Sequence, residues 1–186
     1  VINGDGDDDQ LFGGDGFDFI QGGTGNDLIH GNNDDDEIYG GNGDDHIFGD
    51  AGIDLLFGGS GADVIDGGGD DDEIQAGDGT DSVDGGAGSN LISLGADNDM
   101  LMFNYADHAD SYNSVDGGSG SDTVIFQFKS SQWSNTALQD DVAALKAFFA
   151  SPESAAGETY SMSLIGLDVT HMESVRVFVD GSEVLI

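Results

Sequence analysis

The chain has 186 residues and a formal net charge of −35, because 38 Asp and Glu residues stand against three Lys and Arg residues. Residues 1–128 hold 30 of the carboxylates and no Lys or Arg, so ion pairs between side chains cannot neutralise that region. Repulsion excludes nucleic acids and direct binding to anionic membranes, and the absence of Cys excludes disulfides and thiolate metal sites. Charge alone is typical of an acidic disordered chain, whereas a folded chain needs an added cation.

The first 102 residues are built on a period of nine. Eleven consecutive units fill residues 4–102, and the eighth position of every unit is aliphatic. These aliphatic residues are Leu11, Ile20, Ile29, Ile38, Ile47, Leu56, Ile65, Ile74, Val83, Ile92 and Leu101. Such strict placement argues against disorder and predicts a repeat fold. Ile2 already falls in the same register, so we expect the chain to be a segment of a longer protein.

Within each unit we expect a turn followed by a short strand. Glycines among positions one to six supply the positive φ that tight turns need, and positions seven to nine form a strand with its aliphatic residue inward. A helix is excluded because nine residues make about two and a half turns, which would move the aliphatic side chain from face to face. Two units, or 18 residues, then form one coil of an all-β parallel roll, and each unit lies over the unit two before it.

The sixth position of each unit carries an Asp, or an Asn in one case, and these side chains should form two columns. One column holds Asp9, Asp27, Asp45, Asp63, Asp81 and Asp99, and the other holds Asp18, Asp36, Asp54, Asp72 and Asn90. Strands in neighbouring coils lie about 4.8 Å apart, which leaves room for a cation with bonds near 2.4 Å, within the calcium range of about 2.3–2.6 Å. Magnesium prefers about 2.1 Å and keeps its waters, and zinc prefers His or Cys, which the turns lack. The sequence therefore predicts several Ca²⁺ ions in two columns.

The nonapeptides GGTGNDLIH (22–30), GGNGDDHIF (40–48) and GGSGADVID (58–66) resemble those of the RTX (repeats-in-toxin) haemolysin-type calcium-binding family. The resemblance covers 4–102 and one further unit, GGSGSDTVI, at 117–125. It implies a right-handed parallel β-roll that binds calcium through the position-six side chains, Asp122 included, and through turn carbonyls. The carbonyls in question belong to Gly13, Gly22, Gly31, Gly40, Gly49, Gly58, Gly67 and Gly117. It also implies type I secretion of a larger bacterial protein, whose roll stays unfolded in the low-calcium cytosol and folds outside the cell.

Some units depart from the usual repeat. Position four, usually Gly, is Asp in four units, as Asp7, Asp34, Asp70 and Asp97. Because Asp tolerates the left-handed conformation better than most residues, these turns should persist. Asn90 keeps an oxygen but lacks the charge, so its site should bind calcium more weakly. Ala76 and Leu94 replace the first glycine of their units.

The nonapeptide register breaks after Met102. Five inserted residues, 103–107, would restore the phase, so 103–125 is expected to be an irregular insertion plus a final repeat. The segment 126–186 is expected to cap the open end of the roll, because a stack of repeats leaves an exposed core and sheet edge there. Its apolar spacing predicts a helix at about 137–149, and its Asp-Gly pair predicts a hairpin at about 174–186.

No catalytic site is expected. The four His residues occupy outward or irregular positions, Ser119 does not fit a nucleophile motif, and the repeated Asp residues single out no pair. Outward apolar side chains such as Phe12, Phe48 and Phe57 should pack across strands or beneath the 137–149 helix, with a docking surface for a neighbouring domain as the alternative.

Two functions remain open for a secreted, extracellular or cell-surface protein. In the first, the chain is a calcium-driven folding and export module that serves upstream domains and uses the type I secretion machinery. In the second, it is a calcium-stiffened structural element of a bacterial surface adhesin. The nonapeptides fit both, because their chemistry concerns the ion rather than the domains attached to them.

Overall fold

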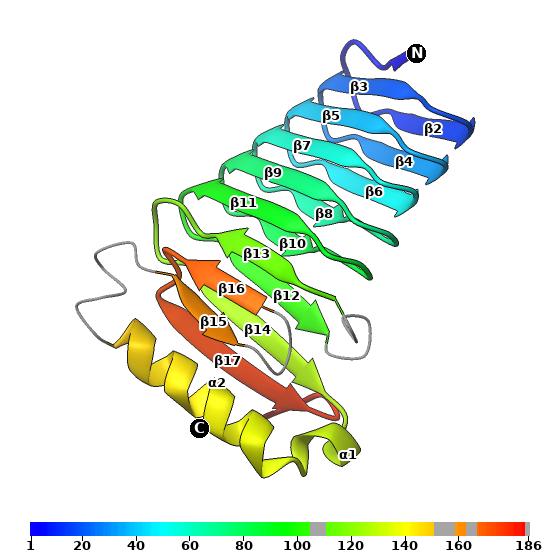
Figure 1. The fold of residues 1–186 in the computed structure, drawn as a ribbon. Helices are drawn as coiled ribbons and strands as arrows, with labels where there is room; N and C mark the ends of the chain where they lie inside the picture. Colours follow the sequence, from blue (N-terminus) through cyan, green and yellow to red (C-terminus); the bar gives the residue numbers. More distant parts are fainter. Residues whose placement is uncertain (105–110, 151–158, 163–166, 185–186) are drawn as a thin grey trace.

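The computed structural model describes residues 1–104, 111–150, 159–162 and 167–184. They form two sheets that face each other across one apolar core, with the coils stacked along a single direction and a helix at the C-terminal end (Figure 1). Among these residues, no helix is long and apolar enough to cross a membrane.

Each sheet collects every second strand of the chain. The first sheet contains, in order, β1 (Ile2–Asn3), β3 (Phe19–Thr24), β5 (Glu37–Asn42), β7 (Leu55–Ser60), β9 (Glu73–Asp78), β11 (Leu91–Ala96), β13 (Asn113–Asp116), β16 (Leu167–Thr170) and β15 (Tyr160–Met162). The second contains β2 (Gln10–Asp15), β4 (Leu28–Asn33), β6 (His46–Ala51), β8 (Val64–Asp66), β10 (Ser82–Asp84), β12 (Met100–Asn104), β14 (Thr123–Phe128), β17 (Ser174–Val179) and β18 (Ser182–Val184). Every pairing is parallel except β15–β16 and β17–β18 at the C-terminal end. The predicted parallel β-roll is confirmed.

The core is a ladder of the position-eight residues. Ile20 pairs with Ile38, and Ile38 with Leu56, so equivalent side chains from successive coils stack directly on one another. All three are fully buried. Burying a side chain of this kind stabilises the fold by about 1.5–3 kcal/mol, and the stacking repeats along both sheets. Ala76 and Leu94, which replace the first glycine of their units, are buried in the same core.

The strands are longer than the three residues expected from the sequence. Most run for six residues and include positions one to three of the next unit, as in β3 with Phe19–Thr24. Position one is where the strand bends, so Gly22 has no partner in the register, but Gly23 and Thr24 pair again with Gly41 and Asn42. The prediction that positions one to six are all turn was therefore wrong. Backbone pairing continues beyond the bend because the equivalent segments of successive coils keep the same offset of 18 residues.

The repeat continues beyond residue 102. Phe103 and Asn104 extend β12 and pair with β14, so the irregular insertion does not begin at 103 as expected. Across it the offset between paired strands becomes 23 residues, as between Asn90 and Asn113, which matches the predicted five extra residues. The remainder of the insertion, 105–110, lies outside the described residues.

The C-terminal segment adds one more coil and a helical layer. β16 and β17 pair parallel with the last repeat strands, β13 and β14. The expected helix is α2 (Thr136–Phe149), preceded by the short α1 (Ser130–Trp133). Leu138, Val142 and Leu145 bury the inner face of α2, which packs on β15 and β17. β17 and β18 form the expected hairpin around Asp180 and Gly181, although its final residues, 185–186, lie outside the described part.

The outward aromatic side chains stack on one another across strands. His30 lies between Phe12 and Phe48, with ring centroids 5.4 and 4.6 Å apart, and its Nδ1 contacts Asp50 Oδ2 at 2.9 Å. Tyr39 stacks on Phe57 at 4.5 Å. The helix α2 packs on β15 and β17 and does not cover these side chains. They pack across strands, which is the first of the expected arrangements.

Candidate metal centre

The position-six side chains form two continuous columns, each linked by hydrogen bonds from coil to coil. The backbone N–H of Asp45 donates to Oδ1 of Asp63 at 2.8 Å, and the N–H of Asp63 donates to Oδ1 of Asp81 at 2.8 Å. The same link runs from Asp9 to Asp122 in one column and from Asp18 to Asn90 in the other. Each carboxylate after the first in its column therefore uses one oxygen to accept a hydrogen bond from the preceding coil.

The second carboxylate oxygen is buried without a hydrogen-bond partner in nearly every repeat. Among the described residues this applies to Oδ2 of Asp9, Asp27, Asp36, Asp45, Asp54, Asp63, Asp72, Asp81, Asp99 and Asp122. Asp18 lies at the open N-terminal end, where its side chain is only partly buried. An ionised oxygen removed from water without a partner is strongly unfavourable. A regular row of such oxygens is the feature expected of sites that bind a cation.

For eight of these carboxylate oxygens, a backbone carbonyl oxygen of the next coil lies across the space beside the first glycine of the unit, which we call the glycine gap. The units of Asp81 and Asp99 begin with Ala76 and Leu94 instead. A Cβ atom on Gly40 would lie 2.5 Å from Asp45 Oδ2 and 2.6 Å from the carbonyl oxygen of Gly58 in the next coil. A larger residue at position one would fill this gap, which explains why glycine predominates there. The two nearest atoms at this gap are oxygens, one of them from a carboxylate, and Ile47 Cδ1 lies 3.0 Å from the same Cβ position.

The glycine gaps account for most of the turn carbonyls expected to bind calcium. The carbonyls of Gly22, Gly31, Gly40, Gly49, Gly58 and Gly67 each lie at the gap of the preceding coil. Three further carbonyls, those of Ala76, Gly85 and His171, occupy the same place and were not predicted. The structure places no gap of this kind next to the predicted carbonyls of Gly13 and Gly117 among the described residues. The assignment of all these carbonyls as calcium ligands stays a prediction.

Asn90 gives an internal comparison for the geometry. Its Nδ2 lies where Oδ2 lies in the other repeats, 2.8 Å from a Cβ atom built on Gly85. From there it donates a hydrogen bond to the carbonyl oxygen of Gly85 at 2.8 Å. Where the residue is Asp, an oxygen replaces this donor, so that two acceptors stand close together. A proton or a metal ion between them would remove the repulsion.

Burial raises the pKa values of the column carboxylates. The pKa of Asp72 is raised to about 8, and those of Asp54 and Asp63 to about 7, from the ordinary 3.8. Desolvation is the largest cause, and neighbouring carboxylates raise the pKa further, whereas the hydrogen bond from the preceding backbone N–H lowers it. At neutral pH these groups are costly to keep ionised unless a cation compensates them.

Two members of the columns lie beyond the predicted ligands. Asn113 follows Asn90, whose N–H donates to Asn113 Oδ1 at 3.0 Å. Glu173 follows Asp122, whose N–H donates to Glu173 Oε2 at 2.5 Å. Asn113 could be found by counting back from Gly117, but Glu173 has no glycine near it. Its one sequence signal is that ESVRVFV repeats the alternation of DTVIFQF.

The exposed position-five side chains link the coils in the opposite direction. Asp8 Oδ1 accepts a hydrogen bond from the N–H of Asn26, and Asp44 Oδ1 accepts one from the N–H of Ala62, both at 2.8 Å. Their backbone partners therefore lie in the following coil, whereas those of the position-six carboxylates lie in the preceding one. These hydrogen bonds give the acidic residues a second function, which is to hold the turns in register, and the nonapeptide pattern did not predict it.

The donor set fits calcium. Within the described part of the chain no point is surrounded by three or more His, Cys, Asp or Glu side chains. Each gap offers one carboxylate oxygen and one backbone carbonyl oxygen. Calcium takes six to eight hard oxygen ligands and accepts irregular geometry and water. Zinc would need nitrogen or sulfur ligands, which no gap provides.

Fold and site together define a calcium-binding parallel β-roll. The chain belongs to the RTX calcium-binding nonapeptide repeat family, whose sequence pattern matches four stretches, residues 1–20, 12–47, 39–74 and 66–101. A comparison with curated proteins finds no match. The RTX repeats bind Ca²⁺, and the buried Asp columns are the part of this structure that suits the ion.

Proposed function

We propose that this chain is an extracellular module that folds when it binds calcium and thereby supports the secretion and folding of a larger bacterial protein. The observation that carries the proposal is the row of buried Oδ2 atoms without hydrogen-bond partners, in a region with no Lys or Arg. The sequence itself has no means of compensating these charges. The free energy of folding therefore depends on an ion from outside the chain.

Dependence on calcium suits a protein that must cross a membrane unfolded. In low calcium the column carboxylates repel one another, and a pair of like charges about 4.8 Å apart costs around 1 kcal/mol even in water. Extracellular calcium modules bind with dissociation constants of about 0.1–1 mM, far above cytosolic levels. The roll would stay unfolded during export and fold outside the cell, where it would help attached domains to fold.

The site supports a structural role and not a catalytic one. Nearly every unit presents the same carboxylate, in the same environment, with the same partners on either side. Acid–base catalysis would need two groups whose surroundings push their pKa values apart. Here burial raises the pKa values of all the column groups that shift.

Far-UV circular dichroism of the whole chain tests the proposal. In chelator at neutral pH we expect the signal of a disordered chain, and in millimolar calcium the signal of β-strands. Magnesium at the same concentration is the matched control and should leave the chain largely unfolded, because it keeps its waters. Full β signal in chelator at neutral pH would contradict calcium-driven folding.

A further inference from the structure

The turn between β16 and β17 takes the place of a nonapeptide turn. In the last regular repeat, residues 117–122 connect β13 to β14, and the equivalent connection in the next coil is residues 171–173, which we call the junction turn. Three residues thus replace six, and the shorter path places His171 in the left-handed region at φ 50° and buries Met172 completely. The strands on both sides nevertheless keep the parallel register of the roll.

The junction turn supplies the carbonyl that completes the last glycine gap. A Cβ atom on Gly117 would lie 2.9 Å from Asp122 Oδ2 and 2.1 Å from the carbonyl oxygen of His171. Asp122 is fully buried, and its Oδ2 has no hydrogen-bond partner. Its carboxylate faces this gap as Asp45 faces the gap at Gly40, except that the opposing carbonyl comes from outside the nonapeptides.

Glu173 continues the column into the junction turn. Its Oε2 accepts a hydrogen bond from the N–H of Asp122 at 2.5 Å, as Asp122 Oδ1 accepts one from the N–H of Asp99 at 2.9 Å. The junction turn therefore reproduces both features of a regular turn, an acidic partner for the preceding N–H and a carbonyl at the gap.

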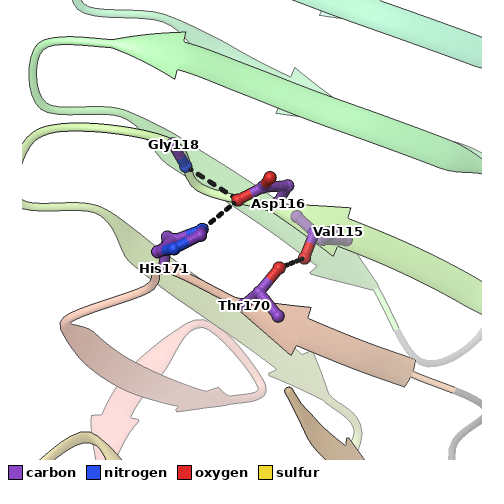
Figure 2. A network of polar contacts seen from close by, with 5 residues as sticks. All are labelled: Val115, Asp116, Gly118, Thr170 and His171. Atoms are coloured by element: carbon purple, nitrogen blue, oxygen red, sulfur yellow. Dashed lines mark hydrogen bonds and ion pairs between the residues drawn. The ribbon is translucent and has the colours of Figure 1, made fainter. Parts of the chain in front are cut away.

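Polar contacts with the last regular coil hold His171 in place (Figure 2). His171 Nδ1 lies 2.6 Å from Asp116 Oδ1, which also accepts a hydrogen bond from the N–H of Gly118 at 3.1 Å. Thr170 Oγ1 donates to the carbonyl oxygen of Val115 at 3.2 Å. These contacts involve the side chains of His171 and Thr170, while the His171 carbonyl oxygen lies beside Gly117.

We propose that a calcium ion binds at the glycine gap of Gly117, coordinated by Asp122 Oδ2 and the His171 carbonyl, and so joins the roll to its C-terminal cap. The proposal rests on the proposed function, since it takes the column carboxylates to be calcium ligands. It adds that the cap itself contributes a ligand. Docking of the cap and binding of calcium at this site are then one coupled equilibrium, in which each strengthens the other by the same factor.

The test uses the whole chain and compares Asp122→Asn with the matched control Asp63→Asn in the same column. Asn fits such a position, as Asn90 shows, so both variants should still fold in calcium. Trp133 is the only tryptophan and lies in α1, against Phe128 with ring centroids 5.2 Å apart, so its fluorescence reports on the cap. Circular dichroism reports on the roll.

Both variants should lose bound calcium relative to the unchanged chain, measured by calorimetric titration. Only Asp122→Asn should separate the calcium midpoint of Trp133 fluorescence from that of circular dichroism by several-fold, because it removes the ion that couples the cap to the roll. If Asp63→Asn loses calcium but Asp122→Asn loses none and leaves the Trp133 midpoint unchanged, the junction site is wrong and the proposed function stands. If the unchanged chain binds no calcium, the proposed function fails as well.

Discussion

Asn90 Nδ2 donates a hydrogen bond to the carbonyl oxygen of Gly85 at 2.8 Å, within one nonapeptide unit. The other members of its column, from Asp36 to Asp72, present a buried oxygen at the equivalent point. A carboxylate there cannot make this bond unless it is protonated. A proton can therefore do for the calcium-free roll part of what a calcium ion does for the loaded one.

The first prediction concerns pH in the absence of calcium. The pKa of Asp72 in the folded chain is raised to about 8, and the pKa values of Asp54 and Asp63 to about 7, above the ordinary 3.8. Groups with a raised folded pKa bind protons on folding, so their contribution to stability is present below 3.8 and is lost as pH rises through the folded pKa. The free energy of unfolding in chelator should therefore fall between about pH 4 and about pH 8.

Circular dichroism in chelator across that range measures the effect. Strand signal should grow on acidification and disappear on return to slightly alkaline pH. Calcium binding gives a control with the opposite sign, because protons compete with the ion for Oδ2, so the folded chain should bind calcium more weakly as the pH is lowered. A calcium-free signal that does not change with pH would show that the column carboxylates do not limit folding.

The second prediction is that Asp63→Asn makes the roll less dependent on calcium. The new amide can donate to the carbonyl of Gly58 as Asn90 does to Gly85, a gain of about 0.5–1.5 kcal/mol for one hydrogen bond, and it removes one buried charge. In chelator this variant should gain strand signal at a higher pH than the unchanged chain, while binding less calcium. Asp63→Ala removes the same charge without the donor, and should lack the pH effect if the hydrogen bond is its cause.

The third prediction compares two positions that differ in charge. Asp45→Ala removes a buried carboxylate oxygen and also the acceptor for the N–H of Asp27, which bonds it at 2.8 Å. Asn90→Ala removes an acceptor for the N–H of Asp72, but no charge. Calcium titration should show the larger loss of binding for Asp45→Ala. Equal losses would mean that the carboxylate oxygens are not the ligands.

The fourth prediction concerns the order in which the coils fold. The N–H of each position-six residue donates to the coil that follows it. A coil exposed at the C-terminal end therefore buries an N–H without a partner. A coil exposed at the N-terminal end only leaves a carboxylate oxygen facing water. Residues 1–102 alone should therefore need much more calcium to fold than the whole chain. Deletion of residues 1–21 should shorten the roll and leave the calcium midpoint almost unchanged. Circular dichroism measures the calcium midpoints of both truncated chains. If residues 1–102 fold at the calcium midpoint of the whole chain, the cap is not needed for folding.

The period of nine was enough to predict the roll, its core and the two columns, because inward side chains and buried Asp recur at fixed positions. The period could not reveal which oxygen of each carboxylate accepts a hydrogen bond. The bond from Asp45 N–H to Asp63 Oδ1 depends on the distance between neighbouring coils. Asp7 and Asp34 adopt the positive φ values expected of them, 80° and 73°, because that requirement is local to the turn.

Features formed between distant segments were the ones missed. The six-residue strands depend on pairing beyond the bend at position one, which no single unit displays. Glu173 joins its column through a turn that has lost three residues and every glycine, so the pattern that identifies the other ligands is absent there. The pairing of β17 with β14 in the structure places Glu173 in this column.

The alternation of strands between two sheets restricts how the length of such a protein can change. Since β16 must follow the first sheet and β17 the second, the number of units before the cap has to keep its parity. Losing or gaining 18 residues changes the height of the stack by one coil and leaves every remaining neighbour in place, as the offset of Asp27 from Asp45 shows. Losing or gaining nine residues would move every unit on one side of the change to the opposite column. The cap would then meet the wrong sheet. We therefore expect duplications and deletions within the repeats to be tolerated only in whole coils.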